Sequence, residues 1–324
     1  MVEKIRLSIG TAVQLGLEEG RLDPFFSTAF LMTFQDDKCE SNCAFCPQAR
    51  DSYSSSDRLS RISWPEYDLE SLIDKWQEGR FRRICIQTIC YVNVVNDVID
   101  IASKLRQVSK LPISVAIHSI EKREMIRLRE SGVSNVGIAL DASTPQLFEE
   151  IKGEKRNSTY RWHRHIKALE DALDVFGKGN VATHLIIGLG ETEKEATEFI
   201  FQMYKMGIGI GLFAFTAIKG TDLEGRPSPD LSSYRRIQVI RHLVSKGLLS
   251  PEQISSDDEG RVSLDINDAS ITNALSSGEA FQVTGCKGCN RPFYNERPRG
   301  PMYNYPRPLN KNEVIDAIKE THLV

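Results

Sequence analysis

The sequence contains no long apolar run, no strong charge bias and no recognisable targeting segment. No stretch approaches the roughly 20 apolar residues that a helix needs to span a bilayer, so no membrane span is predicted. The 41 basic and 44 acidic side chains give a net charge of -3, which excludes a global field that attracts nucleic acid or anionic membrane. Charged side chains interrupt the short apolar runs near the N-terminus, unlike a secretory signal. We therefore expect a cytoplasmic protein that binds neither nucleic acid nor membrane.

Internal repeats are also absent, which excludes a solenoid or a propeller. The seven cysteines are an odd number and they cluster along the chain. This usage suits metal or redox chemistry in a reducing compartment better than a disulfide framework. The 324 residues are enough for one large domain, such as an α/β barrel with extensions.

Short apolar runs alternate with longer stretches of helical periodicity. In most runs the odd and the even positions are both apolar, as expected of parallel strands that are covered on both faces. The alternation predicts right-handed βαβ units, and six to seven units favour a partial or full (β/α) TIM-type barrel. The runs lie at 28–34, 82–89, 112–119, 135–141, 181–189, 209–218 and, less regular than the others, 261–267.

The chain divides into three expected segments. Residues 1–27 are predicted to form an N-terminal helical extension, residues 28–270 the barrel, and residues 271–324 a C-terminal extension. Within the last segment, residues 286–312 show no period and are rich in Pro, Arg, Asn and Tyr. Their aromatic side chains and paired cysteines favour an irregular segment pinned onto the barrel over a disordered tail.

Three cysteines lie close together just after the first predicted strand. Cys39, Cys43 and Cys46 form C-x3-C-x2-C at the carboxyl edge of that strand, where barrel active sites lie. Thiolates are ligands for iron–sulfur clusters and for zinc, but a structural zinc site normally has a fourth protein ligand. Three protein ligands leave one corner of a cubane cluster open to a cofactor. Zinc stays the alternative at this point.

This spacing, with Phe45 beside the last cysteine, resembles the signature of the radical S-adenosylmethionine (SAM) superfamily. The resemblance implies that Cys39, Cys43 and Cys46 hold a [4Fe-4S] cluster whose open iron binds the methionine moiety of SAM. It further implies that one electron from the cluster cleaves SAM to a 5′-deoxyadenosyl radical. Hydrogen abstraction by that radical needs no general acid or base.

The segment HLIIGLGET (184–192) is similar to the fifth-strand cofactor element of this superfamily. Ile186, Gly188 and Glu191 match that element, and His184 replaces its first glycine. The resemblance implies that the glycine lets the backbone approach the adenosyl group, while Glu191 caps the next helix or fixes the loop. Taken alone, the segment is also typical of a plain strand-to-helix turn.

Two further segments are similar to cofactor elements only in part. ALDAS (139–143) resembles the ribose-contacting element of biotin synthase, with Asp141 matching and Ala139 in place of an asparagine. The alternative for Asp141 is a helix N-cap. The usual Gly-Gly-Glu element on the second strand is missing, and Gln87 and Thr88, or their backbone carbonyls, are the expected substitutes.

The remaining cysteines suggest a second cluster. Cys286 and Cys289 form a C-x2-C pair, and a zinc knuckle would need two more ligands nearby. Cys85, on the second predicted strand, aligns with a cysteine that ligates the auxiliary cluster of biotin synthase. The other barrel ligands of that cluster have no counterpart here, so the biotin-synthase cluster itself is excluded. If the C-terminal segment folds back onto the barrel, we expect Cys286 and Cys289 to join Cys85 around a differently held auxiliary iron–sulfur cluster, with its fourth ligand open. Alternatively, Cys85 and Cys90 are small buried side chains that pack in the core and bind no metal. No role is assigned to Cys90.

Over most of its length the chain resembles biotin-synthase-related proteins, and within that group one subunit of the archaeal two-protein lipoyl synthase. This implies radical-mediated sulfur insertion into an octanoyl chain on a lysine of a carrier protein. The implied partners are a paralogous radical SAM subunit, the octanoylated carrier protein and a low-potential electron donor such as ferredoxin. The alternatives are another biotin-synthase-like reaction (sulfur insertion into a small molecule, rearrangement or methylthiolation), a cluster storage or maturation protein, and a zinc-stabilised binding module without catalysis.

Overall fold

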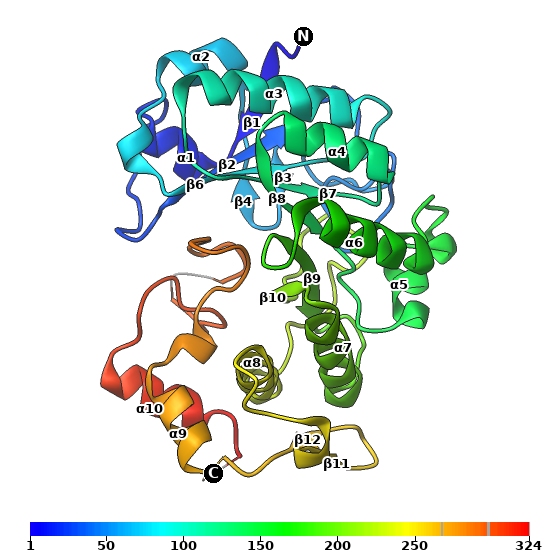
Figure 1. The fold of residues 1–324 in the computed structure, drawn as a ribbon, viewed down its shortest axis with the longest axis vertical. Helices are drawn as coiled ribbons and strands as arrows, with labels where there is room; N and C mark the ends of the chain where they lie inside the picture. Colours follow the sequence, from blue (N-terminus) through cyan, green and yellow to red (C-terminus); the bar gives the residue numbers. More distant parts are fainter. Residues whose placement is uncertain (267, 297–298, 324) are drawn as a thin grey trace.

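The computed structural model describes residues 1–266, 268–296 and 299–323, and its main sheet forms a partial barrel (Figure 1). Within these residues the sheet has eight strands in the order β10-β9-β8-β7-β6-β2-β1-β5. Strands β2 and β6 to β10 pair in parallel, as the alternating pattern predicts. The bounds are β1 Lys4–Leu7, β2 Thr28–Thr33, β5 Glu66–Asp68, β6 Arg83–Gln87, β7 Ile113–Ile117, β8 Val133–Ile138, β9 Val181–Ile187 and β10 Gly209–Ala214.

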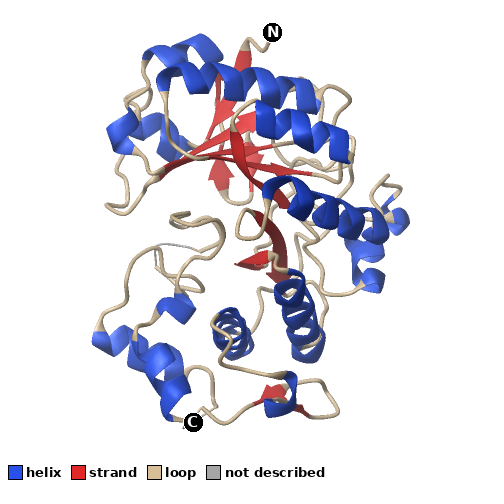
Figure 2. Cartoon of the chain, viewed as in Figure 1, coloured by secondary structure: helices blue, strands red, loops and turns tan. Residues whose placement is uncertain are grey.

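Helices follow the parallel strands and cover the outer face of the sheet (Figure 2). Local signals set their ends: α7 begins with a capping box between Thr192 and Glu195 and ends at Gly207 in a left-handed conformation. The helices are α1 Ile9–Gln14, α2 Leu69–Asp74, α3 Val94–Val108, α4 Lys122–Glu130, α5 Pro145–Ile151, α6 Trp162–Phe176, α7 Glu193–Met206, α8 Leu231–Ser245, α9 Ala269–Ser276 and α10 Lys311–Lys319. None of those formed by the described residues combines the length and apolar character of a membrane span.

The two faces of strand β6 show how the barrel places polar groups in its interior. Ile84 and Ile86 are completely buried on the helix-covered side. Since side chains alternate along a strand, Arg83, Cys85 and Gln87 all point to the barrel interior. The core is therefore apolar between sheet and helices, and a polar column lines the inside.

Two expected elements differ from the structure. Residues 1–27 are not only helical, because β1 pairs antiparallel with β2 and with β5 and so extends the sheet. The run at 261–267, whose last residue lies outside the described ranges, contributes no barrel strand. Its residues Val262–Ser263 form β12, which pairs with β11 (Ser255–Ser256) in a separate two-stranded sheet, as β3 (Arg58–Leu59) does with β4 (Ile62–Ser63). Both cases involve runs too short for periodicity to assign.

The C-terminal extension lies beside the open side of the barrel (Figure 1). Residues 284–296, called the strap below, bond to both edges of the parallel sheet. On one edge Leu212 N donates to Thr284 Oγ1 at 2.8 Å, and on the other Asn290 N donates to Thr28 Oγ1 at 3.2 Å. The buried Arg235 of α8 anchors the following chain, since its guanidinium donates to the carbonyls of Met302 and Tyr303. The pinned segment that the sequence predicts is thus found.

Candidate cofactor site

Residues 39–51 form the cluster loop, which follows β2 and is closed by its own backbone. Cys39 N donates to Gln48 O at 3.0 Å, and Arg50 N donates to Ser41 O at 2.9 Å. Between them, Cys46 N donates to Cys43 O at 3.0 Å. These bonds bring the three cysteines of the sequence motif onto one compact loop at the carboxyl end of the strands.

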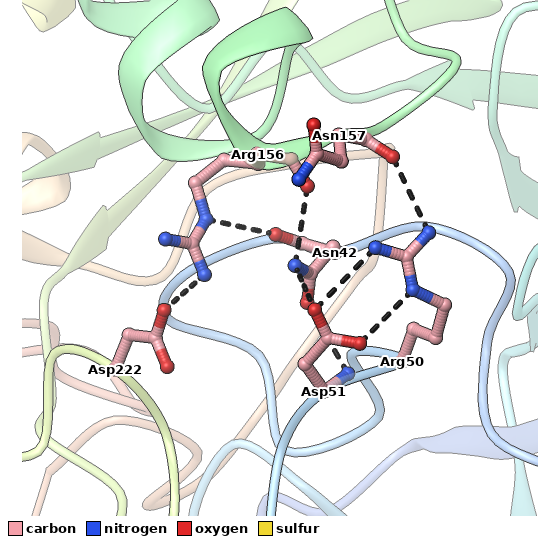
Figure 3. Close-up of polar contacts among 6 residues, drawn as sticks. All are labelled: Asn42, Arg50, Asp51, Arg156, Asn157 and Asp222. Carbon is pink, nitrogen blue, oxygen red and sulfur yellow. Dashed lines mark hydrogen bonds and ion pairs between the residues drawn. The ribbon is translucent and has the colours of Figure 1, made fainter.

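The outer side of the cluster loop is clamped by polar contacts from two distant segments (Figure 3). Asn42 Nδ2 donates to Asp51 Oδ2 at 2.8 Å and to Arg156 O at 3.1 Å. Arg156 returns a bond from Nε to Asn42 O at 3.3 Å and also ion-pairs with Asp222, in the loop after β10. The loop is therefore fixed between the β8–α6 connection and the β10–α8 connection.

Burial keeps the thiols of the cluster loop protonated. Desolvation, helped by the neighbouring thiols of the motif, raises the pKa of Cys43 well above its ordinary value and that of Cys46 to about 12. Cys39 is also shifted upward by burial, although Cys90 N–H donates to its sulfur at 3.1 Å and opposes the shift. Thiols with such pKa values stay neutral until a metal displaces their protons.

The raised pKa values lead to a prediction for the iron-free protein. The thiolate is the form that alkylates, so labelling of Cys43 and Cys46 by iodoacetamide should be slow at about pH 7 and speed up about tenfold per pH unit. Mass spectrometry of peptides labelled between about pH 7 and about pH 10 measures this slope. Rapid labelling of both residues at neutral pH, with no further increase in rate at higher pH, would show that the pKa values of these two thiols are not raised by burial.

An interior cavity of about 140 Å³ lies beside the cluster loop, inside the barrel. Four of the residues expected to bind SAM line it, and so does His184, which replaces a family glycine. The strap closes the cavity with Tyr294 and Asn295. The expected residues are Phe45, Gln87, Asp141 and Ile186.

Asp141 is not a helix N-cap, because Thr144 caps α5 and accepts from Leu147 N at 3.2 Å. Instead the Asp141 carboxylate ion-pairs with the buried Lys152 at 2.6 Å and lines the interior cavity. The Lys152 charge also reaches the cluster loop, where it opposes the effect of burial on the pKa of Cys43. Nothing in the sequence separates Lys152 from an exposed neighbour such as Lys155, so its buried position could not be predicted.

Glu191 fixes the loop after β9, as one of the two expected roles requires. Its carboxylate accepts from Gly188 N at 2.6 Å and from Leu189 N at 3.1 Å. Gly188 has a φ of +105°, and a Cβ there would lie 3.0 Å from Pro229 Cδ. This glycine is thus required by the turn and by its contact with the loop before α8. Neither Gly188 nor Glu191 is among the residues that line the interior cavity.

Replacing Glu191 with glutamine should loosen this turn, because a glutamine has one acceptor oxygen for two backbone donors. We expect a loss of about 1–3 kcal/mol in the free energy of unfolding and a weaker affinity for SAM. Urea unfolding and equilibrium dialysis with labelled SAM measure the two quantities. The matched control is Glu195→Gln, in the exposed capping box four residues along, which should leave SAM affinity unchanged.

Gln87 and Thr88, which are expected to replace the missing Gly-Gly-Glu element, lie in different surroundings. Gln87 lines the interior cavity, and its amide donates to Cys85 Sγ at 3.0 Å. Thr88 is not among the lining residues; its hydroxyl and its backbone N–H both bond Ala116 O, at 3.0 and 3.1 Å. The Thr88 side chain therefore supports the β6–β7 edge in this structure, and Gln87 is the residue placed to meet a ligand.

The three remaining candidate ligands meet inside the barrel. Cys85 pairs in register with Ser114 of β7, and Ser114 Oγ donates to Cys286 Sγ at 3.5 Å. Cys289 N in turn donates to Cys286 O at 2.8 Å. Burial, followed by the neighbouring thiols Cys289 and Cys286, raises the pKa of Cys85 above its ordinary range. The strap therefore folds back onto the barrel and brings Cys286 and Cys289 close to Cys85.

A buried arginine accompanies this second group of thiols. Arg83 is 2% exposed, donates to Lys287 O and to Ser114 Oγ, and keeps a buried Nε without a partner among the described residues. Its charge lowers the pKa of both Cys85 and Cys289 against the effect of burial. The signal for it was present in the sequence, because a charged residue inside an otherwise apolar strand needs a partner.

Within the described ranges, no group of three or more His, Cys, Asp or Glu side chains surrounds a position for one metal ion. Thiolates that bind different corners of a cubane cluster stand further apart than the ligands of a single ion. Both groups of cysteines offer soft sulfur donors, with Cys39 and Cys85 buried and the other four partly buried, and soft sulfur is the donor that iron–sulfur clusters take. The residues present thus fit clusters.

A wider cleft of about 890 Å³ lies outside the barrel, between α3, α4 and α6. Cys90 and Tyr160 line this cleft, and a hydrogen bond from the Tyr160 hydroxyl helps to lower the pKa of Cys90, which burial raises to about 11. Through its backbone N–H, Cys90 also supports Cys39. Cys90 is therefore a neighbour of the cluster loop and lies apart from the Cys85 group.

Comparison with known proteins identifies the family. The model of the radical SAM superfamily matches residues 37–203, which is more than half of the 324 residues. The chain therefore belongs to the radical SAM superfamily. This membership implies a [4Fe-4S] cluster and SAM as cofactors.

Its sequence relatives include biotin synthases. One from Pelotomaculum thermopropionicum is 25% identical over 260 residues, covering 72% of this chain and 76% of that protein. Another, from Clostridium botulinum, is 23% identical over 220 residues, covering 65% of this chain and 64% of that protein.

Solved structures confirm the fold. Methylornithine synthase superimposes with a TM-score of 0.52 and 13% identity, covering 66% of this chain and 63% of that one. The [FeFe]-hydrogenase maturase HydG gives a TM-score of 0.52 and 12% identity, covering 72% of this chain and 57% of that one. At such identities the likeness concerns the partial barrel alone.

Proposed function

We propose that this chain is a sulfur-insertion enzyme, and that it acts as one subunit of a lipoyl synthase that adds sulfur to a protein-bound octanoyl-lysine. The observation that carries the proposal is the second group of thiols. Cys85, Cys286 and Cys289 meet in the same barrel interior that holds the interior cavity, and Gln87 lies between the two, lining the cavity while its amide donates to Cys85.

In this proposal Cys39, Cys43 and Cys46 hold the cluster that binds SAM, and Cys85, Cys286 and Cys289 hold an auxiliary cluster. The first cluster supplies reductive cleavage of SAM, and the second supplies the sulfur. The chain itself binds and orients: Asp141 accepts from the ribose hydroxyls, and Phe45 and Ile186 pack against the adenosyl group. The strap excludes water, since Tyr294 packs against Phe30 and Trp64 over the open side.

The proposed partners are those that the resemblance to the two-protein lipoyl synthase implies. The octanoyl arm of a carrier protein is the substrate, a paralogous radical SAM subunit performs the other insertion, and a low-potential donor such as ferredoxin supplies the electron. Sulfur insertion into a small molecule is the second candidate, because the sequence relatives include biotin synthases.

The test is anaerobic incubation of the reconstituted protein with SAM, a reductant and octanoylated carrier, with and without the paralogous subunit. We expect the intact mass of the carrier to rise by one sulfur. A parallel reaction with the sulfur-free precursor of biotin serves as the discriminating arm. Conversion of that precursor, with the carrier left unchanged, would refute the lipoyl assignment in favour of the second candidate.

A further inference from the structure

Lys152 is a buried charged residue whose ammonium group has several defined partners. It lies at the C-terminal end of α5, and 3% of its surface is exposed. Its ammonium ion-pairs with Asp141 Oδ2 at 2.6 Å and donates to Ala139 O at 2.7 Å. The rings of Phe148 and Tyr160 each lie 5.4 Å from Nζ. Because a buried ammonium is costly unless it is paired, these contacts mark a defined position rather than a chance burial.

The same segment is tied to the cluster loop. Ala44 N, next to Cys43, donates to Ile151 O, next to Lys152, at 2.7 Å. Asp141 itself is held by parallel-bridge bonds: its N donates to His184 O, and its O accepts from Ile186 N, both at 2.9 Å. Its φ of +64° is a left-handed conformation that is unusual for a residue other than glycine. The backbone of Asp141 is thus fixed by β9, and its carboxylate by Lys152.

We propose that Lys152 is a positioning residue of the cofactor site: it holds the Asp141 carboxylate at the cavity wall for the ribose hydroxyls of SAM. By bonding Oδ2, it leaves Oδ1 to accept from the ligand. It also places a positive charge near the anionic cluster, which favours the reduced state. The proposal rests on the cofactor site put forward above and is independent of the acyl substrate.

A mutant cycle tests whether Lys152 acts through Asp141. SAM affinity is measured by equilibrium dialysis on anaerobically reconstituted wild-type protein, Lys152→Met, Asp141→Asn and the double variant. We expect each single change to weaken binding about 10- to 100-fold, as is common for residues that orient a ligand group. The double variant, which buries no unpaired charge, should bind no more weakly than the weaker single variant. Additive losses would overturn the proposal, because Lys152 would then act on its own.

The reduction potential of the SAM-binding cluster is the second readout, followed by EPR during a redox titration. Lys152→Met should lower the midpoint potential, and Lys152→Arg should keep it near the wild-type value. The matched control is Lys155→Met, which removes a lysine that pairs with Glu150 on the surface at 2.8 Å and should change neither quantity. Unchanged affinity and potential in Lys152→Met, with SAM cleaved normally by the wild type, would refute this inference alone. Failure of the wild type to bind SAM would refute the proposed function itself.

Discussion

Replacing Cys43 with alanine is expected to abolish reductive cleavage of SAM. Cys43 is the central thiol of the cluster loop, and without it only Cys39 and Cys46 remain on that loop as ligands for the cluster. A cluster held by two thiolates leaves more than one iron open and is lost or rearranged on reduction. The formation of 5′-deoxyadenosine, measured by liquid chromatography after addition of dithionite, should fall to the level of protein-free samples.

Cys90→Ala is the matched control for this prediction. Cys90 is a second buried cysteine next to the loop, but it supports Cys39 through its backbone N–H, which alanine keeps. This variant should therefore cleave SAM at close to the wild-type rate. If Cys43→Ala cleaves SAM as well as Cys90→Ala does, the cluster loop is not the site of the reaction.

Replacing Cys289 with alanine should separate the two halves of the proposed chemistry. Cys289 lies on the strap and is not one of the three thiols of the cluster loop, so SAM cleavage should stay within about twofold of the wild type. Sulfur transfer to the octanoylated carrier should be lost, and the iron content should fall from about eight to about four atoms per chain. Intact-protein mass spectrometry and iron analysis measure the two effects.

Cys85→Ala should reproduce this result, because Cys85 and Cys289 belong to one thiol group on two distant parts of the chain. Ser114→Ala is the milder variant: it removes only the hydroxyl that donates to Cys286 Sγ and should retain part of the transfer. Wild-type levels of product in Cys289→Ala would show that the strap thiols hold no sulfur source.

The alternation of apolar runs and helical stretches predicted the parallel strands and their helices, because strands such as β6 to β10 are long enough to be recognised from the sequence pattern. It failed for β1 and for the run at 261–267, where four and two residues of strand are too few to separate from coil. The motif spacing predicted that Cys39, Cys43 and Cys46 share one loop after a strand, and the structure places them on such a loop after β2. The meeting of Cys85 with Cys286 depends on how the strap crosses the open side, which no local pattern encodes.

The cofactor side chains divide in the same way. Phe45, Asp141 and Ile186 line the cavity because each follows or ends a strand whose position the alternation fixes. Lys152 could not be placed from the sequence, since its role depends on its tertiary partner Asp141. For Arg83 the sequence shows a charge inside an apolar strand, but it does not show the partners Ser114 and Lys287. Thr88 was placed on the correct strand end, yet its side chain bonds Ala116.

The most direct test of the central claim is the EPR spectrum of the protein with only one cluster left. The variant Cys286→Ala/Cys289→Ala, reconstituted without oxygen and reduced, should contain about four irons and show a cubane signal that changes when SAM is added. The change is expected because Cys39, Cys43 and Cys46 leave one iron free to bind the cofactor. A signal that SAM does not alter, or a protein that holds zinc and no iron, would contradict the account.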